Sequence, residues 1–310
     1  MEARITDVTT AHGLTAVQFT TSLCDTFDYI SGAKAIKQKL LEVKEFTESG
    51  SVNKLIVLNS SDKFVFMMDG DILVGAKQNR VLNTSVLLAP QSKTVIPVSC
   101  VEQGRWNYVS AKFHAPDYAA PHALRSLKAE AVRSNLMANK TFDADQGGVW
   151  KRVGQYEASH KFHSRTGNLS EIYEHKRASI DDILEKFHSK KGANGVALYR
   201  GKSFCGLDIY NRSAVLKEYF PKLLQGVALD LTPSDENHVM AKGEPEYRTL
   251  ALFDEIEAAE KHAFDAVGVG LEKRFDLPAA SGFMLEYQAK GIHLALLQKE
   301  GVSRRGSHSL

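Results

Sequence analysis

The chain has 310 residues, of which 43% are hydrophobic and 25% are charged. This composition excludes a disordered chain and predicts a folded protein with one large core or two moderate ones. The 39 basic and 37 acidic residues nearly cancel, so no overall field attracts nucleic acid or an anionic membrane. We therefore expect neither a nucleic-acid partner nor a membrane partner.

The N-terminus and the cysteines indicate a compartment. The first residues lack the cationic and then apolar pattern of a secretory signal, and no run of about 18 apolar residues would cross a bilayer. Cys24, Cys100 and Cys205 are odd in number and far apart, without a Cys-x-x-Cys pair. This usage argues for a reducing compartment and against a thiolate zinc site. We expect a cytoplasmic protein and assign no residue to a metal site; whether the protein uses a metal stays open.

Short apolar runs predict sheet in the first part of the chain. Between about residues 41 and 110 these runs, at 55–58, 64–68 and 95–98, are separated by turn signals. Asp69-Gly70 suits a tight turn, because glycine adopts positive φ at little cost. A β-meander or a sandwich follows from this pattern.

Beyond about residue 116 the hydrophobic period becomes helical. Helices are predicted near residues 123–140, 179–190, 213–229 and 247–273. Pro221 would stop or kink the third of them. The chain then closes with a hairpin formed by 283–287 and 292–297, with its turn around Lys290-Gly291.

These patterns predict an α+β protein. Antiparallel sheet from both halves would form the core, and about four helices would lie at its periphery. We expect residues 1–300 to form a single domain, β-rich over about 1–115 and mixed over about 116–300. Residues 301–310 have no periodicity and are expected to be a disordered tail.

An internal similarity leaves a duplicated β unit open. Val65 to Gly75 aligns with Val196 to Gly206 without a gap, and glycines coincide at the middle and at the end. The alternative is that two hairpins with glycine turns look alike because turns demand glycine.

Two segments crowd polar side chains between apolar runs. They are Asp69-Gly-Asp-Ile-Leu-Val-Gly-Ala-Lys-Gln-Asn-Arg80 and Val98-Ser-Cys-Val-Glu-Gln-Gly-Arg-Trp106. Such groups are costly to bury without partners, so their crowding indicates a site. Arg80 and Arg105 are the candidates to hold phosphate or carboxylate, because a guanidinium offers planar donors to either group.

The same arginines have a structural alternative. Arg80 or Arg105 could pair with Glu102 or Asp71 inside the sheet, which would make the polar residues a buried network and not a ligand site. The two interpretations differ in geometry, since a site needs Arg80, Glu102 and Arg105 to converge on an open pocket. A network needs them to close on one another.

Neighbouring residues complete the candidate ligand site. Lys77, Gln78 and Asn79 would orient a sugar or base. Trp106 would stack a flat ring, and an extended backbone would place Tyr108 on the same face. Core packing is the alternative use of the two rings.

Glu102 is the candidate general acid or base, because a carboxylate beside arginines could activate water. Cys100 is the second catalytic candidate, since an extended backbone places it on the same face as Glu102. A nucleophilic thiolate requires an adjacent base or a lowered pKa, and the alternative is a small buried thiol. Whether the chain is an enzyme stays open; an enzyme with these residues would be a hydrolase acting on a nucleotide-derived substrate.

Two weaker patterns lie further along the chain. His160-Lys-Phe-His163 lacks the carboxylates or cysteines that accompany most zinc sites. Ser164 to Ser170 combines hydroxyl groups with an arginine, which is typical of a phosphate-contacting loop or of an ordinary capping loop. No dinucleotide or phosphate-loop fingerprint identifies a cofactor, and no pattern fixes an oligomeric state.

The segments 69–80 and 96–106 resemble a prokaryotic family, the ADP-ribosylglycohydrolase- and rhodanese/phosphatase-associated protein domain. The likeness covers most of the chain and extends to 163–167, 194–202 and 291–295. The chain has Ala76 where a second glycine is expected before Lys77. The family's name records a genomic association with ADP-ribose-processing enzymes, so the resemblance implies a function that involves NAD-derived nucleotides.

The leading functional prediction is therefore that the protein binds an ADP-ribose-like or other phosphorylated nucleotide as its small-molecule partner. An enzyme of this kind would hydrolyse that ligand. The alternative is a non-catalytic protein-interaction module whose polar cluster is structural.

Overall fold

The computed structural model describes residues 1–47 and 50–301. Its largest element is an eight-stranded antiparallel sheet formed by the two ends of the described chain and two strands from its middle. In spatial order the strands are β1 (Ala3–Ala11), β2 (Leu14–Thr21), β12 (Gly195–Arg200), β13 (Ser203–Tyr210), β17 (Lys290–Gln298), β16 (Ala280–Tyr287), β15 (Leu271–Leu277) and β14 (His262–Asp265). Nearly the whole predicted tail lies outside the described residues.

Two smaller sheets come from the early part of the chain. The six-stranded sheet contains, in order, β11 (Phe113–His114), β7 (Ile72–Gly75), β8 (Arg80–Leu82), β10 (Ser92–Cys100), β5 (Lys54–Asn59) and β4 (Leu41–Glu45). The three-stranded sheet contains β3 (Ile30–Ser31), β6 (Val65–Met67) and β9 (Val86–Leu88), with β3 parallel to β6.

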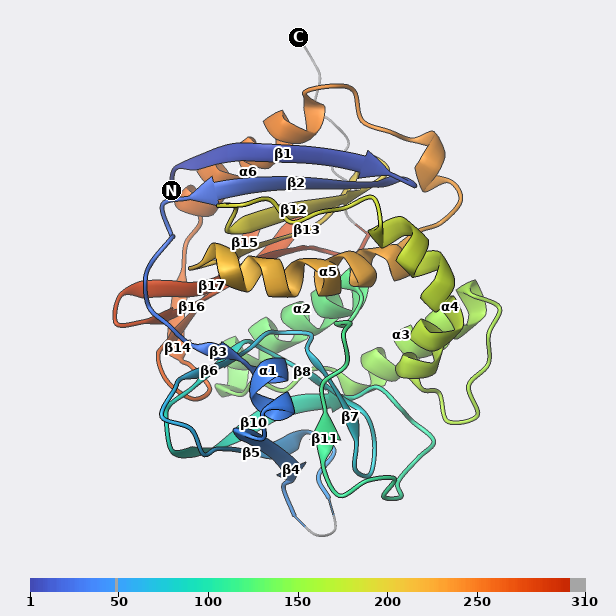
Figure 1. The fold of residues 1–310 in the computed structure, drawn as a ribbon, viewed down its shortest axis with the longest axis vertical. Coiled ribbons are helices and arrows are strands. Elements are labelled where there is room, and N and C mark those ends of the chain that lie inside the picture. Colours follow the sequence, from blue (N-terminus) through green and yellow to red (C-terminus); the bar gives the residue numbers. More distant parts are fainter. Residues whose placement is uncertain (48–49, 302–310) are drawn as a thin grey trace.

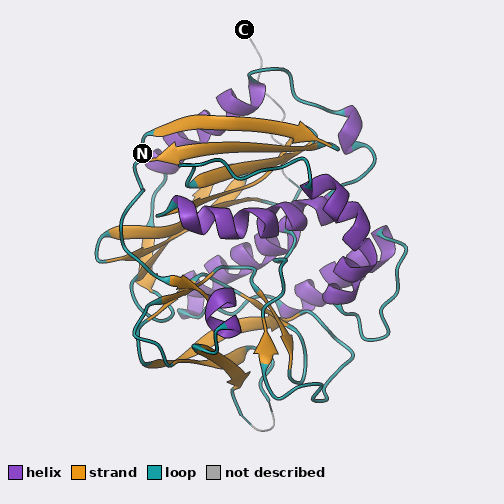
Figure 2. Cartoon of the chain, in the orientation of Figure 1, coloured by secondary structure: helices purple, strands orange, loops and turns teal. Residues whose placement is uncertain are grey.

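Within residues 1–47 and 50–301, six α-helices connect and cover the sheets. They are α1 (Gly32–Lys37), α2 (His122–Asn139), α3 (Gln146–Ser159), α4 (Leu169–Leu184), α5 (Ser213–Asp230) and α6 (Glu244–Ala258). Figure 1 shows β1, β2 and β12 toward one end of the molecule and β4, β5 and β10 toward the other, with α2 and α5 between them. Figure 2 shows α3 and α4 at one side of this stack. The predicted α+β class with mainly antiparallel sheet is confirmed.

The hydrophobic core follows this layering. One buried cluster packs Val215, Leu216 and other apolar residues of α5 against Leu198 of β12 and against Phe66 and Leu87 of the small sheet. The opposite face of the large sheet is covered by α6, through a cluster that includes Leu252, Phe253 and Ile256. Burial of apolar surface from both halves of the chain therefore joins the sheets.

Buried charges fix α2 between the sheets. Arg125 donates from its Nη1 and Nη2 atoms to both carboxylate oxygens of Asp208, at 3.0 and 2.7 Å, and its Nε atom donates to Asp69 at 3.2 Å. Lys128 donates to the other Asp69 oxygen at 2.9 Å. Asp71 lies beside Lys222, 3.2 Å away, and not beside the arginines that the sequence offered as partners. The two aspartates of the first polar segment therefore hold helices α2 and α5 in place.

Two predicted helices have different bounds. The helix expected at 179–190 begins ten residues earlier as α4, because Asn168 accepts a hydrogen bond from the Ser170 N–H at 2.9 Å and caps it. Ser179, the first residue of the predicted range, lies inside the helix and donates to the carbonyl of Lys176. The helix expected at 247–273 ends at Ala258, and the chain then forms β14 and β15. Gly268 and Gly270, both at positive φ, provide the connection between these strands.

The structure also bears on the predictions for Pro221 and for the closing hairpin. Pro221 lies within α5 and does not end it; Pro221 and Lys217 are both exposed, so water can satisfy the carbonyl that loses its intrahelical partner. The closing hairpin is present as β16 and β17, but its turn is Gln288-Ala289.

The aligned segments 65–75 and 196–206 are not equivalent in the fold. The second segment lies in the β12–β13 hairpin, whereas the first divides between β6 and β7, which belong to different sheets. None of the helices in the described residues combines the length and the apolar composition needed to cross a bilayer.

Candidate functional site

The predicted site residues do come together, in a group that we call the closed cluster: Gln78, Asn79, Arg80, Glu102, Arg105, Thr166 and Asn168. It assembles where the turn before β8, the loop after β10 and the loop before α4 meet. An isolated antiparallel bridge between Glu102 and Asn168 joins the last two segments. The structure thus combines both polar segments with the 164–170 loop.

Glu102 and Arg105 form a pair inside this cluster. Arg105 donates from Nε to one Glu102 oxygen at 2.8 Å and from Nη2 to the other at 2.6 Å. The carboxylate also accepts from the Thr166 hydroxyl at 2.9 Å and from the Asn79 backbone N–H at 3.2 Å. Glu102 is 3% exposed. Four donors therefore surround a buried carboxylate, and the Arg105 guanidinium is used inside the protein.

The amides of the cluster are satisfied in the same way. The side-chain oxygen of Asn79 accepts from the Gly75 N–H at 3.0 Å, and the side-chain amide nitrogen of Asn79 donates to the Asn168 side chain at 3.0 Å. Gln78 donates to the Gln103 carbonyl at 3.3 Å. Ala76 has a φ of 43°, which explains why glycine is expected at this position of the turn. The amides thus fix backbone segments against one another.

Arg80 is fully buried under an exposed aromatic ring. Its Nη1 atom donates to the Gln78 side chain at 3.3 Å, and its Nη2 atom lies 3.6 Å from a Glu45 oxygen. Its guanidinium carbon lies 5.7 Å from the centroid of the Trp106 ring. Its Nε atom is buried and has no hydrogen-bond partner among the described residues. This geometry is that of a desolvated arginine held by a carboxylate and an aromatic face, without open space for a ligand.

Trp106 and Tyr108 do not lie on a strand. They belong to the loop after β10 and are 41% and 54% exposed, so neither packs in the core. The Lys77 ammonium lies 5.6 Å from the centroid of the first ring and 5.1 Å from the second. These three residues form the surface above the closed cluster.

Cys100 lies beneath the same region without exposure to solvent. Its thiol donates to the Val52 carbonyl at 3.4 Å, and burial raises its pKa to about 11. A thiol in this environment stays protonated at neutral pH, whereas nucleophilic catalysis requires the thiolate.

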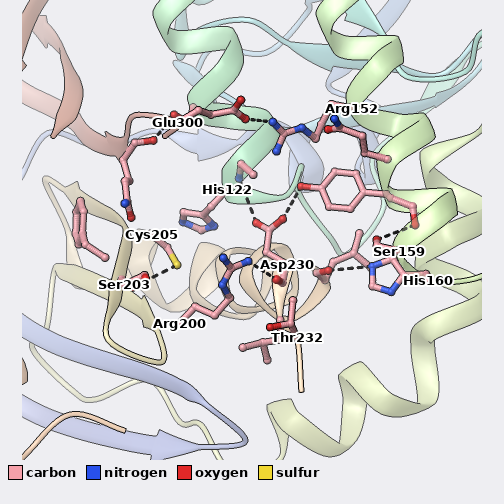
Figure 3. A pocket seen from close by; sticks show the side chains of 18 of the residues that line it. His122, Arg152, Ser159, His160, Arg200, Ser203, Cys205, Asp230, Thr232 and Glu300 are labelled. Atoms are coloured by element: carbon pink, nitrogen blue, oxygen red, sulfur yellow. Dashed lines mark hydrogen bonds and ion pairs between the residues drawn. The ribbon is translucent and has the colours of Figure 1, made fainter. Parts of the chain in front are cut away.

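A cavity of about 740 Å³ lies elsewhere, where the N-terminus of α2, helix α3, the C-terminus of α5 and the β12–β13 turn meet (Figure 3). None of the residues predicted to form the site lines it. The charged side chains along its walls are Arg152, Lys176, Arg200, Lys299, Asp230 and Glu300. Cations thus outnumber carboxylates, and the cavity favours an anion.

The two arginines of the cavity differ in how their donors are used. Arg152 pairs with Glu300 through Nη2, and Arg200 donates through Nη1 to the backbone carbonyl of Asp230. The Nε atom of Arg152 is buried and has no hydrogen-bond partner among the described residues. The Nε atom of Arg200 lies 3.4 Å from an Asp235 carboxylate oxygen, an ion pair without a hydrogen bond. Buried donors without partners are uncommon and call for an explanation, such as a ligand or an ordered water.

Asp230 lies between the helices at the cavity. Its carboxylate accepts from the Tyr156 hydroxyl at 2.5 Å and from the Ala123 backbone N–H at 3.1 Å, so α5 is tied to α3 and to the start of α2 (Figure 3). Burial raises the pKa of Asp230 above its usual value of 3.8, although both hydrogen bonds act against this rise. A carboxyl group of this kind can hold or release a proton nearer neutral pH.

His160 adds a neutral ring to the cavity. Its Nε2 atom lies 3.0 Å from the Leu229 carbonyl oxygen, which requires the proton on that nitrogen. Burial lowers the pKa of this histidine. Its ring stacks with Tyr156, with the ring centroids 6.3 Å apart. Within the described residues, no three His, Cys, Asp or Glu side chains gather closely enough to hold a metal ion.

The sequence offered one signal for this cavity. Asp230 is an acidic residue at the C-terminal end of a helix, where the helix dipole disfavours negative charge. Such a residue is retained at a cost, and a functional or bridging role is one explanation. Arg152 lies in α3, a helix that the pattern missed because Gly147, Gly148 and Gly154 lower its helical propensity.

Comparison with known proteins identifies one family. Searches among curated proteins and among solved structures found no significant match. The family model described as the ARG and Rhodanese-Phosphatase-superfamily-associated Protein domain, ARPP-1, matches residues 2–297. Its name associates it with ADP-ribosylglycohydrolase and rhodanese-phosphatase proteins. The match spans nearly the whole chain and confirms the resemblance seen in the motifs, so the chain belongs to the ARPP-1 family.

Proposed function

We propose that the protein binds a phosphorylated, nucleotide-type ligand, ADP-ribose or another NAD-derived nucleotide, in the cavity between α2, α3 and α5. The observation that carries this proposal is the excess of cationic over acidic side chains around the cavity, together with the buried Nε donor of Arg152, which lacks a partner among the described residues. Guanidinium groups bind phosphate through paired, charge-assisted hydrogen bonds. The family's association with ADP-ribosylglycohydrolases supports this class of ligand.

The size and lining of the cavity fit such a ligand. Small-molecule sites have volumes of about 300–1,000 Å³, and this cavity measures about 740 Å³. Arg152 and Arg200 would hold the phosphates, with Lys176 and Lys299 adding positive potential. The Asp230 and Glu300 carboxylates would accept hydrogen bonds from ribose hydroxyl groups.

The closed cluster fits this function less well. A phosphate at Arg105 would have to displace Glu102, which already accepts from the Nε and Nη2 atoms of that guanidinium. The displaced carboxylate would remain buried without its charge partner, at a cost of about 3–5 kcal/mol. We therefore assign the cluster the role of joining the two polar segments to the start of α4.

In a hydrolytic reaction, Asp230 would be the acid–base group. It is the half-buried carboxyl of the cavity, its pKa is raised, and the Tyr156 hydroxyl fixes its orientation. General acid–base catalysis uses groups whose pKa lies near the working pH. Release of AMP or ribose phosphate from ADP-ribose by the wild type, and its loss in Asp230→Asn, would establish this role.

Thermal-shift assays and calorimetry test the binding proposal. The purified protein is titrated with ADP-ribose, NAD, AMP and inorganic phosphate, since a ligand at a hundredfold excess over its Kd stabilises the native state by about 2.7 kcal/mol. We expect an upward shift with ADP-ribose or NAD, and its loss in the Arg152→Ala, Arg200→Ala double variant. Arg177→Ala is the matched control, because this arginine pairs with Glu174 and Asp117 outside the cavity.

The competing function is a protein-interaction module with a purely structural polar cluster. It accounts for the closed cluster but not for the excess of cationic side chains around the cavity. No shift with any of the four ligands at millimolar concentration would contradict the binding proposal and favour this alternative.

A further inference from the structure

The first residue of α2 is a histidine with unsatisfied polar atoms. His122 is 2% exposed and lines the cavity, where Figure 3 shows its ring among the labelled side chains. Neither of its ring nitrogens has a hydrogen-bond partner among the described residues. Burying a polar group without a partner is unfavourable, so the fold retains this imidazole at a cost in stability.

Two glycines make room for this ring. A methyl group at Gly206 of β13 would lie 2.7 Å from the His122 Cδ2 atom, which is too close for any side chain. A methyl group at Gly226 of α5 would lie 2.9 Å from the Ala120 carbonyl oxygen and 3.5 Å from the His122 Nδ1 atom. The imidazole therefore occupies a recess formed by the strand and the helix at the wall of the cavity.

The imidazole is neutral in this recess. Burial and the neighbouring Arg125 lower the pKa of His122 to about 3, although Asp208 and Asp69 act in the opposite direction. The Nε2 atom lies 3.9 Å from Asp208, beyond hydrogen-bond distance. Asp208 is committed to Arg125 and to His293, whose Nε2 atom lies 3.1 Å from it. A neutral imidazole offers one donor and one acceptor.

We propose that His122 determines the specificity of the cavity by hydrogen bonding to an uncharged part of the ligand, a ribose hydroxyl or a base amide. This inference rests on the proposed function. A phosphate presents only acceptors and is matched by the charged donors of Arg152 and Arg200. A hydroxyl or an amide can pair with a donor or an acceptor, so a neutral imidazole matches the nucleoside part and distinguishes a nucleotide from an inorganic phosphate.

Calorimetric titrations of three proteins test the assignment. The wild type, His122→Leu and His122→Asn are each titrated with ADP-ribose and with inorganic pyrophosphate. The leucine variant removes both polar atoms, whereas the asparagine variant keeps a donor and an acceptor. Thermal unfolding of the unliganded variants establishes that each is folded; if His122→Leu is not, the asparagine variant and a His122→Gln variant are compared with the wild type.

We expect His122→Leu to weaken ADP-ribose binding about tenfold, the loss of a hydrogen bond worth about 1.4 kcal/mol, and to leave pyrophosphate binding unchanged. His122→Asn is expected to regain part of the ADP-ribose affinity. Equal affinity of all variants for ADP-ribose, or an equal loss for both ligands, would overturn the role of His122 and leave the binding function intact. Absence of binding in the wild type itself would overturn the proposed function.

Discussion

The closed cluster and the cavity contain the same kinds of side chain but differ in the space beside them. In the cluster, the Arg105 guanidinium and the Glu102 carboxylate satisfy each other, with Thr166 and Asn79 adding donors. In the cavity, the buried Nε donor of Arg152 has no partner in the described part of the chain, and the Arg200 Nε atom has only an ion pair with Asp235, at 3.4 Å. The density of polar residues in a sequence therefore indicates that polar groups meet. Their satisfaction and the space around them decide whether a ligand can join them.

The two regions also differ in what their ion pairs contribute to stability. Glu102 and Arg105 have side chains 3% and 13% exposed, so breaking their pair leaves a nearly buried charge. Glu300, the partner of Arg152, is 46% exposed, and such a pair contributes about 0–1 kcal/mol. Substitutions in the cluster should thus affect folding, and substitutions in the cavity should affect binding.

The largest expected effect is that of Arg105→Ala. This change leaves Glu102 buried without its partner and should reduce the free energy of unfolding by about 3–5 kcal/mol, measured by urea denaturation. The affinity of the folded protein for ADP-ribose should stay that of the wild type. A stable Arg105→Ala protein that no longer binds the ligand would reverse the roles of the two regions.

Next in size is the effect of Arg152→Ala and Arg200→Ala on ligand affinity. Each removes charged hydrogen bonds worth about 1.5–3 kcal/mol, which corresponds to a loss of roughly tenfold to a hundredfold in affinity. Their unfolding free energies should change by about 1 kcal/mol at most. Calorimetric titration with ADP-ribose measures the first effect and urea denaturation the second, with Arg177→Ala as the control for both.

A third prediction concerns pH and Asp230. Because its pKa is raised on folding, the folded state binds this proton more tightly than the unfolded state. Stability should therefore fall as pH rises from the ordinary carboxyl pKa through the raised folded pKa. Asp230→Asn should make the unfolding free energy less dependent on pH over this window. Identical pH profiles for the two proteins would show that the carboxyl is not perturbed.

Tyr156→Phe should deepen the same pH dependence. The Tyr156 hydroxyl donates to Asp230 and lowers its pKa, so its removal should raise that pKa further. The expected loss of stability at neutral pH is about 1–3 kcal/mol, and it should shrink as the solution is acidified. Urea denaturation at several pH values measures this change, and a loss that is the same at every pH would contradict the pairing.

The smallest expected effect is that of Asn168→Ala. Asn168 caps α4 and accepts from the Asn79 amide, so it belongs to the closed cluster. Loss of a helix cap costs about 1 kcal/mol, measured by thermal unfolding. Ser179→Ala is the matched control, because this hydroxyl lies exposed within the helix and should be nearly neutral.

The sequence predicted those elements whose local pattern agrees with their packing. Helix α2 was expected at 123–140 and spans His122–Asn139, because its apolar spacing is also the face that the core buries. The prediction of a helix across β14 and β15 was wrong. Alternating and helical spacing of apolar residues coincide there, and the pairing of β15 with β16 decides the outcome. Gly268 and Gly270 were the local signal against a helix.

The candidate site was predictable only in part. The two polar segments do assemble, because both flank strands of one sheet and their side chains need partners. The cavity could not be predicted, since Arg152, Arg200 and Asp230 come from three elements far apart in sequence. No spacing rule joins such residues, and their relation exists only after α3 and α5 have packed.

The most direct test of the account is a calorimetric titration of ADP-ribose into the wild type, Arg200→Ala and Arg105→Ala under identical conditions, on protein shown to be folded. We expect ADP-ribose to bind to the wild type and to Arg105→Ala, and its affinity for Arg200→Ala to be lower by about tenfold or more. Retained affinity in Arg200→Ala together with lost affinity in Arg105→Ala would place the ligand in the cluster and contradict the account.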